Sequence, residues 1–436
     1  MKLAISSTNK QLLFVGFFLL FTKLIALIKE VYLAQTFGIG ALLDAYFIAL
    51  NSSMFIAAVF LAVLPSVLVP YFVKLSNVFE KKFLIGNLSL ASTFVGLINT
   101  LLLIYFSKEI SKIYQYQPGT NDFALVNEFI QTFSLLPLII LLIGIFSSYL
   151  LSVRNNVNSI IEIIPNLIII VSIFLFSTSF PVQSLAIGTV FGFFLHILIL
   201  ILIVFYLYNL KPLFGLNKSS IKNMKFIVRG GFILFFGQFF MSLIGPIDNY
   251  FAISFGEGFV AAYNYAIKLV GIASSLISVL VIRVLLPKFS ELERDNKKLE
   301  LRNLALSYAS IFFVVVFFAS LLAYPFIPFF IDLIFVGGEL TNEKLKLLTQ
   351  LVHAAILQLP FFSFSLIIVQ CYLVKNWIFY VSLFAISNVT VKFISNSILS
   401  NMIGISGLMY SWAIMYFWSG LCLLIFFMFR ELRHDK

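Results

Sequence analysis

Long apolar runs separated by short polar segments recur along the whole chain. A helix needs about 20 mostly apolar residues to cross a bilayer, and about twelve runs reach that length. Their approximate limits are 11–36, 41–73, 83–106, 127–151, 160–177, 184–208, 226–254, 260–287, 303–330, 346–374, 377–397 and 405–429. The pattern therefore predicts an all-α polytopic membrane protein with about 12 transmembrane helices.

Lysine and arginine are distributed unequally over the segments between these runs. One set of loops, together with both termini, carries most of them, whereas the opposite set has only Lys108, Lys112, Lys344 and Lys346. Basic residues accumulate on the cytoplasmic side of membrane proteins. We therefore expect both termini to be cytoplasmic.

The apolar runs also divide into two halves. The segment 209–229 carries basic residues at helical spacing, which predicts an amphipathic cytoplasmic linker between six-helix bundles over 1–208 and 230–436. Residues 30–40 align without gaps on residues 248–258, with matching Tyr, Ala, Phe and Gly positions. Because transporters are often built from such repeats, we expect two parallel six-helix repeats around a central cavity.

Composition narrows the class of protein. The mean hydropathy is +1.07, and only 11% of the residues are charged, whereas soluble domains have about a quarter. Most of the basic residues that give the net charge of +11 lie in loops and termini, so the charge follows membrane topology and does not indicate a nucleic-acid partner. The two cysteines stand apart, and no nucleotide-binding loop or catalytic motif occurs. We expect a protein without enzyme activity, catalytic residues, a metal site or a cofactor.

Several polar residues lie inside the predicted spans, where one charge costs about 2.5–3.5 kcal/mol on insertion scales. They follow helical spacing in the first two helices and in the seventh and eighth, as residues lining one hydrated chamber would. Lys268 has no carboxylate three or four residues away, so we expect it to face substrate. The candidate cavity or coupling residues are Glu30, Asp44, Asn51, Asp248, Asn249 and Asn264.

Simpler interpretations stay open for some of these positions. Lys23 or Lys29 can form a structural ion pair with Glu30 that lets the first helix insert. Asp44 and Asp248 lie near the non-cytoplasmic ends of their helices, where they could be solvated caps. For Lys392, also near a helix end, we expect a long side chain that reaches the membrane surface.

Two parts of the chain match a known pattern. The matching residues are Phe21-Thr22-Lys23, Lys29-Glu30, Phe37-Gly38 and Asp44-Ala45-Tyr46-Phe47 in the first half, and Asp248-Asn249, Tyr263-Asn264-Tyr265-Ala266, Lys268 and Leu285-Leu286-Pro287 in the second. The chain thereby resembles the MurJ/MviN family of lipid II flippases and related exporters in the multidrug/oligosaccharidyl-lipid/polysaccharide superfamily. The resemblance implies alternating access around a cationic cavity, in which Lys23, Lys29 and Lys268 hold the pyrophosphate of an undecaprenyl-linked glycan.

The chain departs from that family in two places. Its second helix has Ser53-Met54-Phe55-Ile56-Ala57-Ala58 where the family places Pro-Asn and an Arg pair. About twelve helices are present, whereas the family tends to have two more. These departures favour an O-antigen or capsule-type repeat unit as the cargo over lipid II itself.

The function predicted from the sequence is thus a flippase for a lipid-linked oligosaccharide in the bacterial inner membrane. Lipid II remains the alternative cargo, and a cation-coupled drug antiporter is the alternative from another class. The expected partners are the lipid-linked glycan and the membrane. The sequence leaves open the oligomeric state and whether transport is coupled to a Na⁺ gradient, a H⁺ gradient or the membrane potential.

Overall fold

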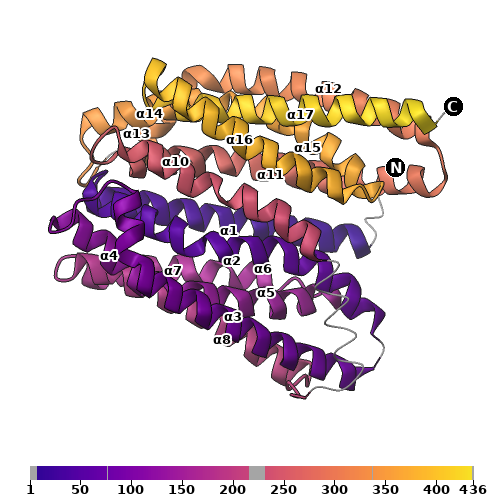
Figure 1. The fold of residues 1–436 in the computed structure, drawn as a ribbon, viewed down its shortest axis with the longest axis horizontal. Helices are drawn as coiled ribbons and strands as arrows, with labels where there is room; N and C mark the ends of the chain where they lie inside the picture. The colour runs from indigo at the N-terminus through magenta and orange to yellow at the C-terminus, as the bar shows by residue number, and fades with distance from the viewer. Residues whose placement is uncertain (1–6, 76, 216–230, 336, 435–436) are drawn as a thin grey trace. The chain divides into compact units, whose positions relative to one another are not determined.

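The computed structural model describes residues 7–75, 77–215, 231–335 and 337–434, and it is helical, with no strand in these ranges. Its helices are α1 (Ser7–Phe37), α2 (Ala41–Lys74), α3 (Val78–Ile113), α4 (Asn121–Phe133), α5 (Leu136–Ser152), α6 (Asn158–Ile161), α7 (Ile163–Phe176), α8 (Pro181–Leu202), η1 (Ile203–Leu207), α10 (Ile244–Ile253), α11 (Phe259–Arg294), α12 (Lys298–Ala323), η2 (Tyr324–Phe326), α13 (Ile327–Phe335), α14 (Asn342–Ile356), α15 (Gln358–Val374), α16 (Ile378–Ile403) and α17 (Ser406–His434). A further helical stretch, residues 231–242, precedes α10. Neighbours in sequence such as α16 and α17 pack side by side (Figure 1).

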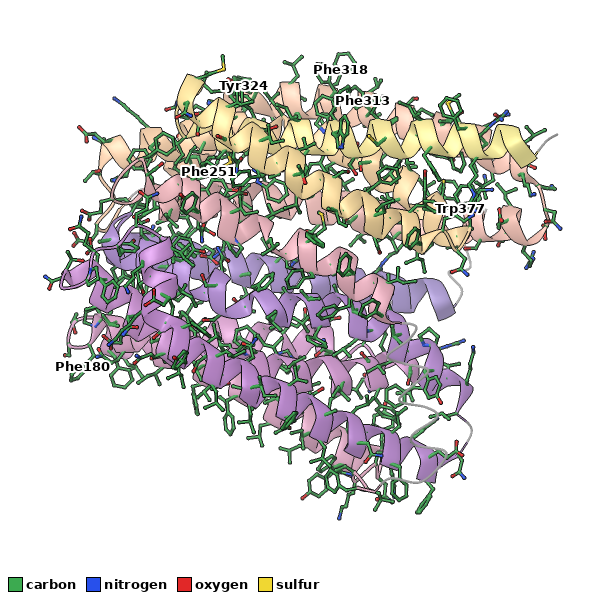
Figure 2. All side chains as sticks on the ribbon, viewed as in Figure 1. Phe180, Phe251, Phe313, Phe318, Tyr324 and Trp377 are labelled. Atoms are coloured by element: carbon green, nitrogen blue, oxygen red, sulfur yellow. The ribbon has the colours of Figure 1, made fainter. Side chains whose placement is uncertain are left out.

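Eleven segments of the described chain are long and apolar enough to cross a bilayer, and α1 is a further helix of 31 residues. Some spans consist of two successive helices, as α4 and α5 do. Large apolar side chains are exposed on the surface, among them Phe180, just before α8, and Phe318 of α12, which are 57% and 61% exposed (Figure 2). Such a surface suits lipid rather than water. The chain is a multi-pass, all-helical membrane protein, as the sequence predicts.

The chain divides into two compact units whose limits do not follow chain order. The first unit comprises residues 1–37 and 48–235, and the second comprises residues 38–47 and 236–436. The short segment that joins α1 to α2 therefore belongs with the second unit. The boundaries of the two bundles, 1–208 and 230–436, stay a prediction from the sequence. Most of the predicted linker over 209–229 lies outside the described residues.

Each unit has its own apolar core. In the first unit, Phe72 of α2 packs with Tyr149 of α5, with ring centroids 5.6 Å apart. In the second unit, Phe289 of α11, Tyr372 of α15 and Phe427 of α17 are buried together. The Tyr372 hydroxyl donates a hydrogen bond of 2.6 Å to a carbonyl of α17, which satisfies its polar end inside the core.

The aligned segments of the two halves share a backbone feature. Gly38 and Gly256, which the sequence alignment pairs, have φ of +68° and +116°. Glycine adopts this left-handed region without the strain that a Cβ imposes. The predicted end of the eighth span at residue 287 is too early for the helix, because α11 continues through Pro287 to Arg294. The apolar run marks the span, while the polar residues beyond it extend the same helix.

Candidate functional site

The predicted site residues fall into two groups, one in each unit. Those of the first unit are Lys23, Lys29, Glu30 and Asn51, and those of the second are Asp44, Asp248, Asn249, Asn264 and Lys268. Asp44 lies in the first turn of α2, within the segment 38–47 that belongs to the second unit.

In the first unit, Lys29 and Glu30 form an ion pair within α1. The Lys29 Nζ lies 2.6 Å from the Glu30 Oε1, and each side chain is 9% exposed. Lys23 is exposed, and its charge attracts the Glu162 carboxylate. Asn51 is half-buried in α2. The sequence left open a structural ion pair in the first helix, and the structure has it between Lys29 and Glu30. The binding of substrate by Lys29 stays a separate prediction.

In the second unit, Asp44 caps the N-terminus of α11. Its carboxylate accepts hydrogen bonds from the Gly258 N–H at 2.5 Å and from the Ala261 N–H at 2.7 Å. Because Gly258, the residue preceding α11, has no side chain to accept these protons, a distant segment supplies the acceptor. The Glu257 carboxylate in turn accepts from the Ala41 N–H at 3.1 Å, at the start of α2. The open interpretation of Asp44 as a solvated cap is excluded, since this residue is only 1% exposed.

Asn249 and Asn264 meet across α10 and α11. The Asn264 Nδ2 donates to the Asn249 Oδ1 at 3.0 Å and to a carbonyl of its own helix at 2.8 Å. The Asn249 Nδ2 reaches the Phe47 carbonyl at 3.5 Å. Both side chains are buried. The polar positions that the sequence placed at matching spacing on these helices thus form one hydrogen-bonded bridge.

Lys268 lies one turn further along α11, where it is half-buried. Its ammonium sits 4.2 Å from the centroid of the Phe47 ring, which is a cation–π distance. Phe47 also packs edge-on against Tyr265, with centroids 5.4 Å apart. Lys268 therefore combines a cation with an aromatic surface, and an ammonium of this kind binds phosphate as a point charge.

Asp248 has a partner that the sequence did not reveal. Lys392 of α16 is fully buried, and its Nζ lies 3.0 Å from the Asp248 Oδ1. The same carboxylate oxygen accepts a hydrogen bond of 2.6 Å from the Asn396 Nδ2, and its other oxygen accepts one from the Tyr263 hydroxyl. The prediction that Lys392 reaches the membrane surface is wrong, and the open interpretation of Asp248 as a solvated cap is excluded, because both side chains are fully buried. The available signal was that ionisable residues within spans usually pair with one another.

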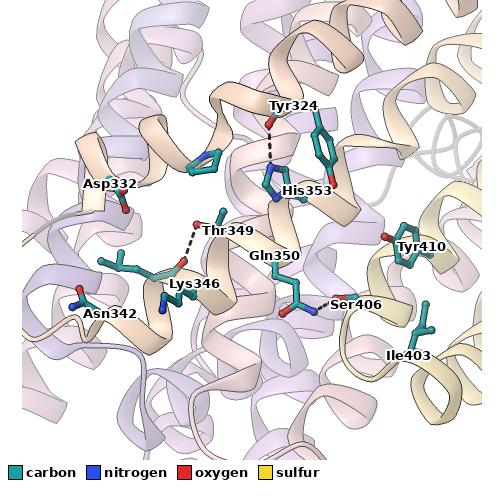
Figure 3. Close-up of a pocket in the computed structure, with 12 residues that line it drawn as sticks. Tyr324, Asp332, Asn342, Lys346, Thr349, Gln350, His353, Ile403, Ser406 and Tyr410 are labelled. Carbon is teal, nitrogen blue, oxygen red and sulfur yellow. Dashed lines mark hydrogen bonds between the residues drawn. The ribbon is translucent and has the colours of Figure 1, made fainter.

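A separate pocket of about 750 Å³ opens in the second unit (Figure 3). The His353 Nε2 lies 3.0 Å from the Tyr324 carbonyl oxygen, and the Gln350 Nε2 donates to the Ser406 Oγ at 3.1 Å. No predicted site residue lines this pocket. Its other polar lining residues are Asp332, Asn342, Lys346, Thr349 and Tyr410.

Several lysines of the described chain could bind an anion, and two of them, Lys29 and Lys392, also pair with a carboxylate. Lysines at buried or half-buried positions supply positive charge in both units. No group of three His, Cys, Asp or Glu side chains in the described residues could hold a metal ion. The arrangement suits a charged organic headgroup, which needs compensating cations wherever water is scarce.

Comparisons with known proteins agree on one family. A family model described as "Lipid II flippase MurJ" matches residues 33–436. The solved structure "Lipid II flippase MurJ, inward closed conformation" is similar with a TM-score of 0.81 and 21% identity, over 95% of this chain and 87% of that one. None of the curated proteins matches the chain significantly.

The same fold occurs in other transporters. An inward-facing multidrug resistance MATE family transporter of the MOP superfamily has a TM-score of 0.77 at 14% identity, over 94% of each chain. A MOP superfamily transporter from Pyrococcus furiosus has a TM-score of 0.68 at 13% identity, over 98% of this chain and 96% of that one. At these identities the likeness concerns the fold alone.

Proposed function

Because the chain belongs to the lipid II flippase MurJ family, we propose that its cargo is lipid II, the undecaprenyl-pyrophosphate-linked precursor of peptidoglycan. Members of this family are flippases and not enzymes. The observation that carries the proposal is the match of the family model over residues 33–436. The sequence-based preference for an O-antigen or capsule unit is not confirmed, and lipid II fits the match better. The family model matches the chain through its second helix, although this helix lacks the Pro-Asn and the Arg pair.

The proposed mechanism is alternating access, in which one bundle moves against the other around the headgroup. Lys23, Lys29 and Lys268 remain our candidates for binding the pyrophosphate, since an anion in a poorly hydrated site needs cations. The inside-negative membrane potential favours outward movement of each negative charge by about 2.3 kcal/mol per 100 mV. We therefore expect the potential to contribute to export.

We further propose an inner-membrane location with both termini cytoplasmic, supported by the distribution of lysine and arginine. In a background without Cys371 and Cys422, an impermeant thiol reagent added outside should label Asn121→Cys and spare Lys298→Cys. The reverse labelling pattern would overturn the orientation, and with it the proposed direction of transport.

The cargo can be tested in a bacterium depleted of its own lipid II flippase. Expression of this chain should restore growth, and lipid II should become accessible to an externally added enzyme that cleaves its headgroup. Lys268→Ala should abolish both readouts at normal membrane abundance, and Lys268→Arg should keep part because the charge survives. Lys288→Ala is the matched control, since Lys288 lies exposed on the same helix.

Failure of the unmodified chain to restore growth at ordinary abundance would contradict lipid II as the cargo. Loss of a surface polysaccharide on deletion from the native host, with cell-wall synthesis intact, would then favour an O-antigen or capsule unit. Resistance to cationic drugs on overexpression, without growth rescue, would instead favour the antiporter alternative.

A further inference from the structure

The ammonium of Lys392 is enclosed by oxygen atoms from three helices. Its Nζ lies 2.6 Å from the Ser411 Oγ, 2.9 Å from the Leu408 carbonyl oxygen, 3.0 Å from the Asp248 Oδ1 and 3.2 Å from the Asn396 Oδ1. The Lys392 and Asp248 side chains are both 0% exposed. We refer to these four oxygens as the oxygen cage.

The oxygen cage combines one carboxylate, one amide oxygen, one backbone carbonyl and one hydroxyl. Oxygen donors of these types are the usual ligands of hard cations in proteins. An ammonium group has only three hydrogens to donate, so four surrounding oxygens within 3.2 Å exceed its own hydrogen-bonding capacity. The Trp412 ring centroid, 4.8 Å from the same nitrogen, adds a further surface that attracts a cation.

A second lysine of the same unit also has a buried side chain and an ion pair. The Lys375 side chain is 4% exposed, and its Nζ lies 3.3 Å from the Glu293 Oε2. The same nitrogen lies 5.4 Å from the Trp377 ring centroid and 5.8 Å from the Phe427 ring centroid. Lys375 therefore serves as a control in which a buried lysine is removed while Lys392 stays in the oxygen cage.

We propose that the oxygen cage is a monovalent-cation site whose cation is supplied by the protein itself, as the tethered ammonium of Lys392. The charge of Asp248 is then compensated at every stage of the transport cycle without a dissociable ion. The site in this chain consequently does not couple transport to Na⁺. This inference concerns the second unit alone and does not depend on lipid II being the cargo.

The oxygen cage is also joined to the predicted substrate-facing helix. Tyr263 of α11 donates to the second carboxylate oxygen of Asp248, and the Trp412 Nε1 donates to the Tyr263 hydroxyl at 2.8 Å. Asp248 and Tyr263 immediately precede Asn249 and Asn264, the residues of the bridge between α10 and α11. A permanent cation therefore holds α10, α11, α16 and α17 together. A dissociable ion would leave the Asp248 carboxylate without a compensating charge whenever it departed.

The test removes the tethered cation and asks whether a free one takes its place. Purified Lys392→Ala protein is compared with the unmodified protein by thermal unfolding in NaCl and in choline chloride at equal ionic strength. The unmodified protein should have the same Tm in both salts. The variant should have a lower Tm in choline, and Na⁺ should raise it by several degrees in a saturable way, because a ligand that binds only the folded state stabilises it.

Two further variants separate a cation site from a structural ion pair. Lys375→Ala should lose stability without any Na⁺-specific recovery, because Lys392 still fills the oxygen cage in this variant. Asp248→Asn combined with Lys392→Ala should lose the Na⁺ effect, because the carboxylate is gone. If Lys392→Ala does not fold, Lys392→Asn empties the same position while adding an amide oxygen and serves in its place.

Two results would overturn the proposal. One is a Na⁺-specific rise in Tm of the unmodified protein, which would mean that a free cation binds despite Lys392. The other is an equal Tm of Lys392→Ala in NaCl and in choline chloride, which would mean that Lys392 is only an ion-pair partner of Asp248. The salt comparison on the unmodified protein needs no variant, so it can refute the proposal even if every substitution impairs folding.

Discussion

The two units each bury a lysine beside a carboxylate, yet they do so in different ways. Lys29 and Glu30 are neighbours on α1, with nitrogen and oxygen 2.6 Å apart and side chains 9% exposed. Asp248 and Lys392 come from different helices, are 3.0 Å apart and are 0% exposed. The Lys29–Glu30 pair lies within one helix, and both of its side chains remain slightly exposed. The Asp248–Lys392 pair joins two helices, and side chains of α16 and α17 form further hydrogen bonds with it.

This difference has an energetic consequence. Removing one partner of a fully buried pair leaves a charge that neither water nor another group compensates, at a cost of about 3–5 kcal/mol. A long lysine side chain near the edge of a buried region can instead move its charge toward water. We therefore expect the network of the second unit to contribute to folding and the pair on α1 to be more tolerant of change.

The largest effect is expected at Asp248. Asp248→Leu should destabilise the protein by about 3–5 kcal/mol, because it leaves the Lys392 ammonium buried without its carboxylate. Asp248→Leu combined with Lys392→Leu should recover a large part of that loss. Thermal unfolding of the single and double variants measures both terms, and a double variant no more stable than Asp248→Leu would show that the pairing is not the cause.

A smaller effect is expected at Glu30. Glu30→Ala should cost about 1–3 kcal/mol, since it removes a charged hydrogen-bond partner of Lys29 without sealing that lysine from water. The same unfolding assay applies, and Glu109→Ala is a control because the Glu109–Lys112 pair is exposed. A loss at Glu30 equal to that at Asp248 would break the contrast between the two units.

Asp44 tests a carboxylate that is satisfied by backbone N–H groups instead of an ammonium. Asp44→Ala should cost about 0.5–2 kcal/mol, the usual range for loss of a helix cap. Asp44→Asn should cost less, because its amide oxygen can still accept one of the two hydrogen bonds. Equal losses for both variants, measured by thermal unfolding, would mean that negative charge matters here more than hydrogen bonding.

The smallest effect is expected at Glu257. Glu257→Ala removes the carboxylate that accepts from the Ala41 N–H, and water can replace it because this hydrogen bond is exposed. We expect a loss of about 0.5 kcal/mol, at the low end for such a cap. A loss larger than that of Asp44→Ala would reverse the proposed order of the two caps.

Much of the candidate site could be predicted from residue spacing along single helices. Asn249 and Asn264 were placed on matching polar stripes, and the structure joins them directly. The ion pair of Lys29 with Glu30 was open as an interpretation, because residues so close in sequence are within reach whatever the tertiary fold. Lys268 was singled out because its own helix offers no carboxylate at three or four residues.

The pairing of Lys392 could not be predicted in the same way. Its distance from Asp248 along the chain leaves many possible partners, and a lysine near a helix end reaches the surface in most membrane proteins. The sequence likewise leaves a solvated cap open for Asp44, because the position of this residue near the start of one helix does not indicate that it caps the N-terminus of another.

The sequence by itself determined the membrane class, the approximate positions of the spans and the helical spacing of their polar residues. Those features follow from transfer free energies, which depend on each residue and its near neighbours. The tertiary structure alone decided which buried charges meet, that Asp44 caps α11 and that four oxygens surround Lys392. Such contacts depend on which helix faces pack together. Hydropathy along one helix cannot predict this pairing, because the apolar faces of different helices are similar.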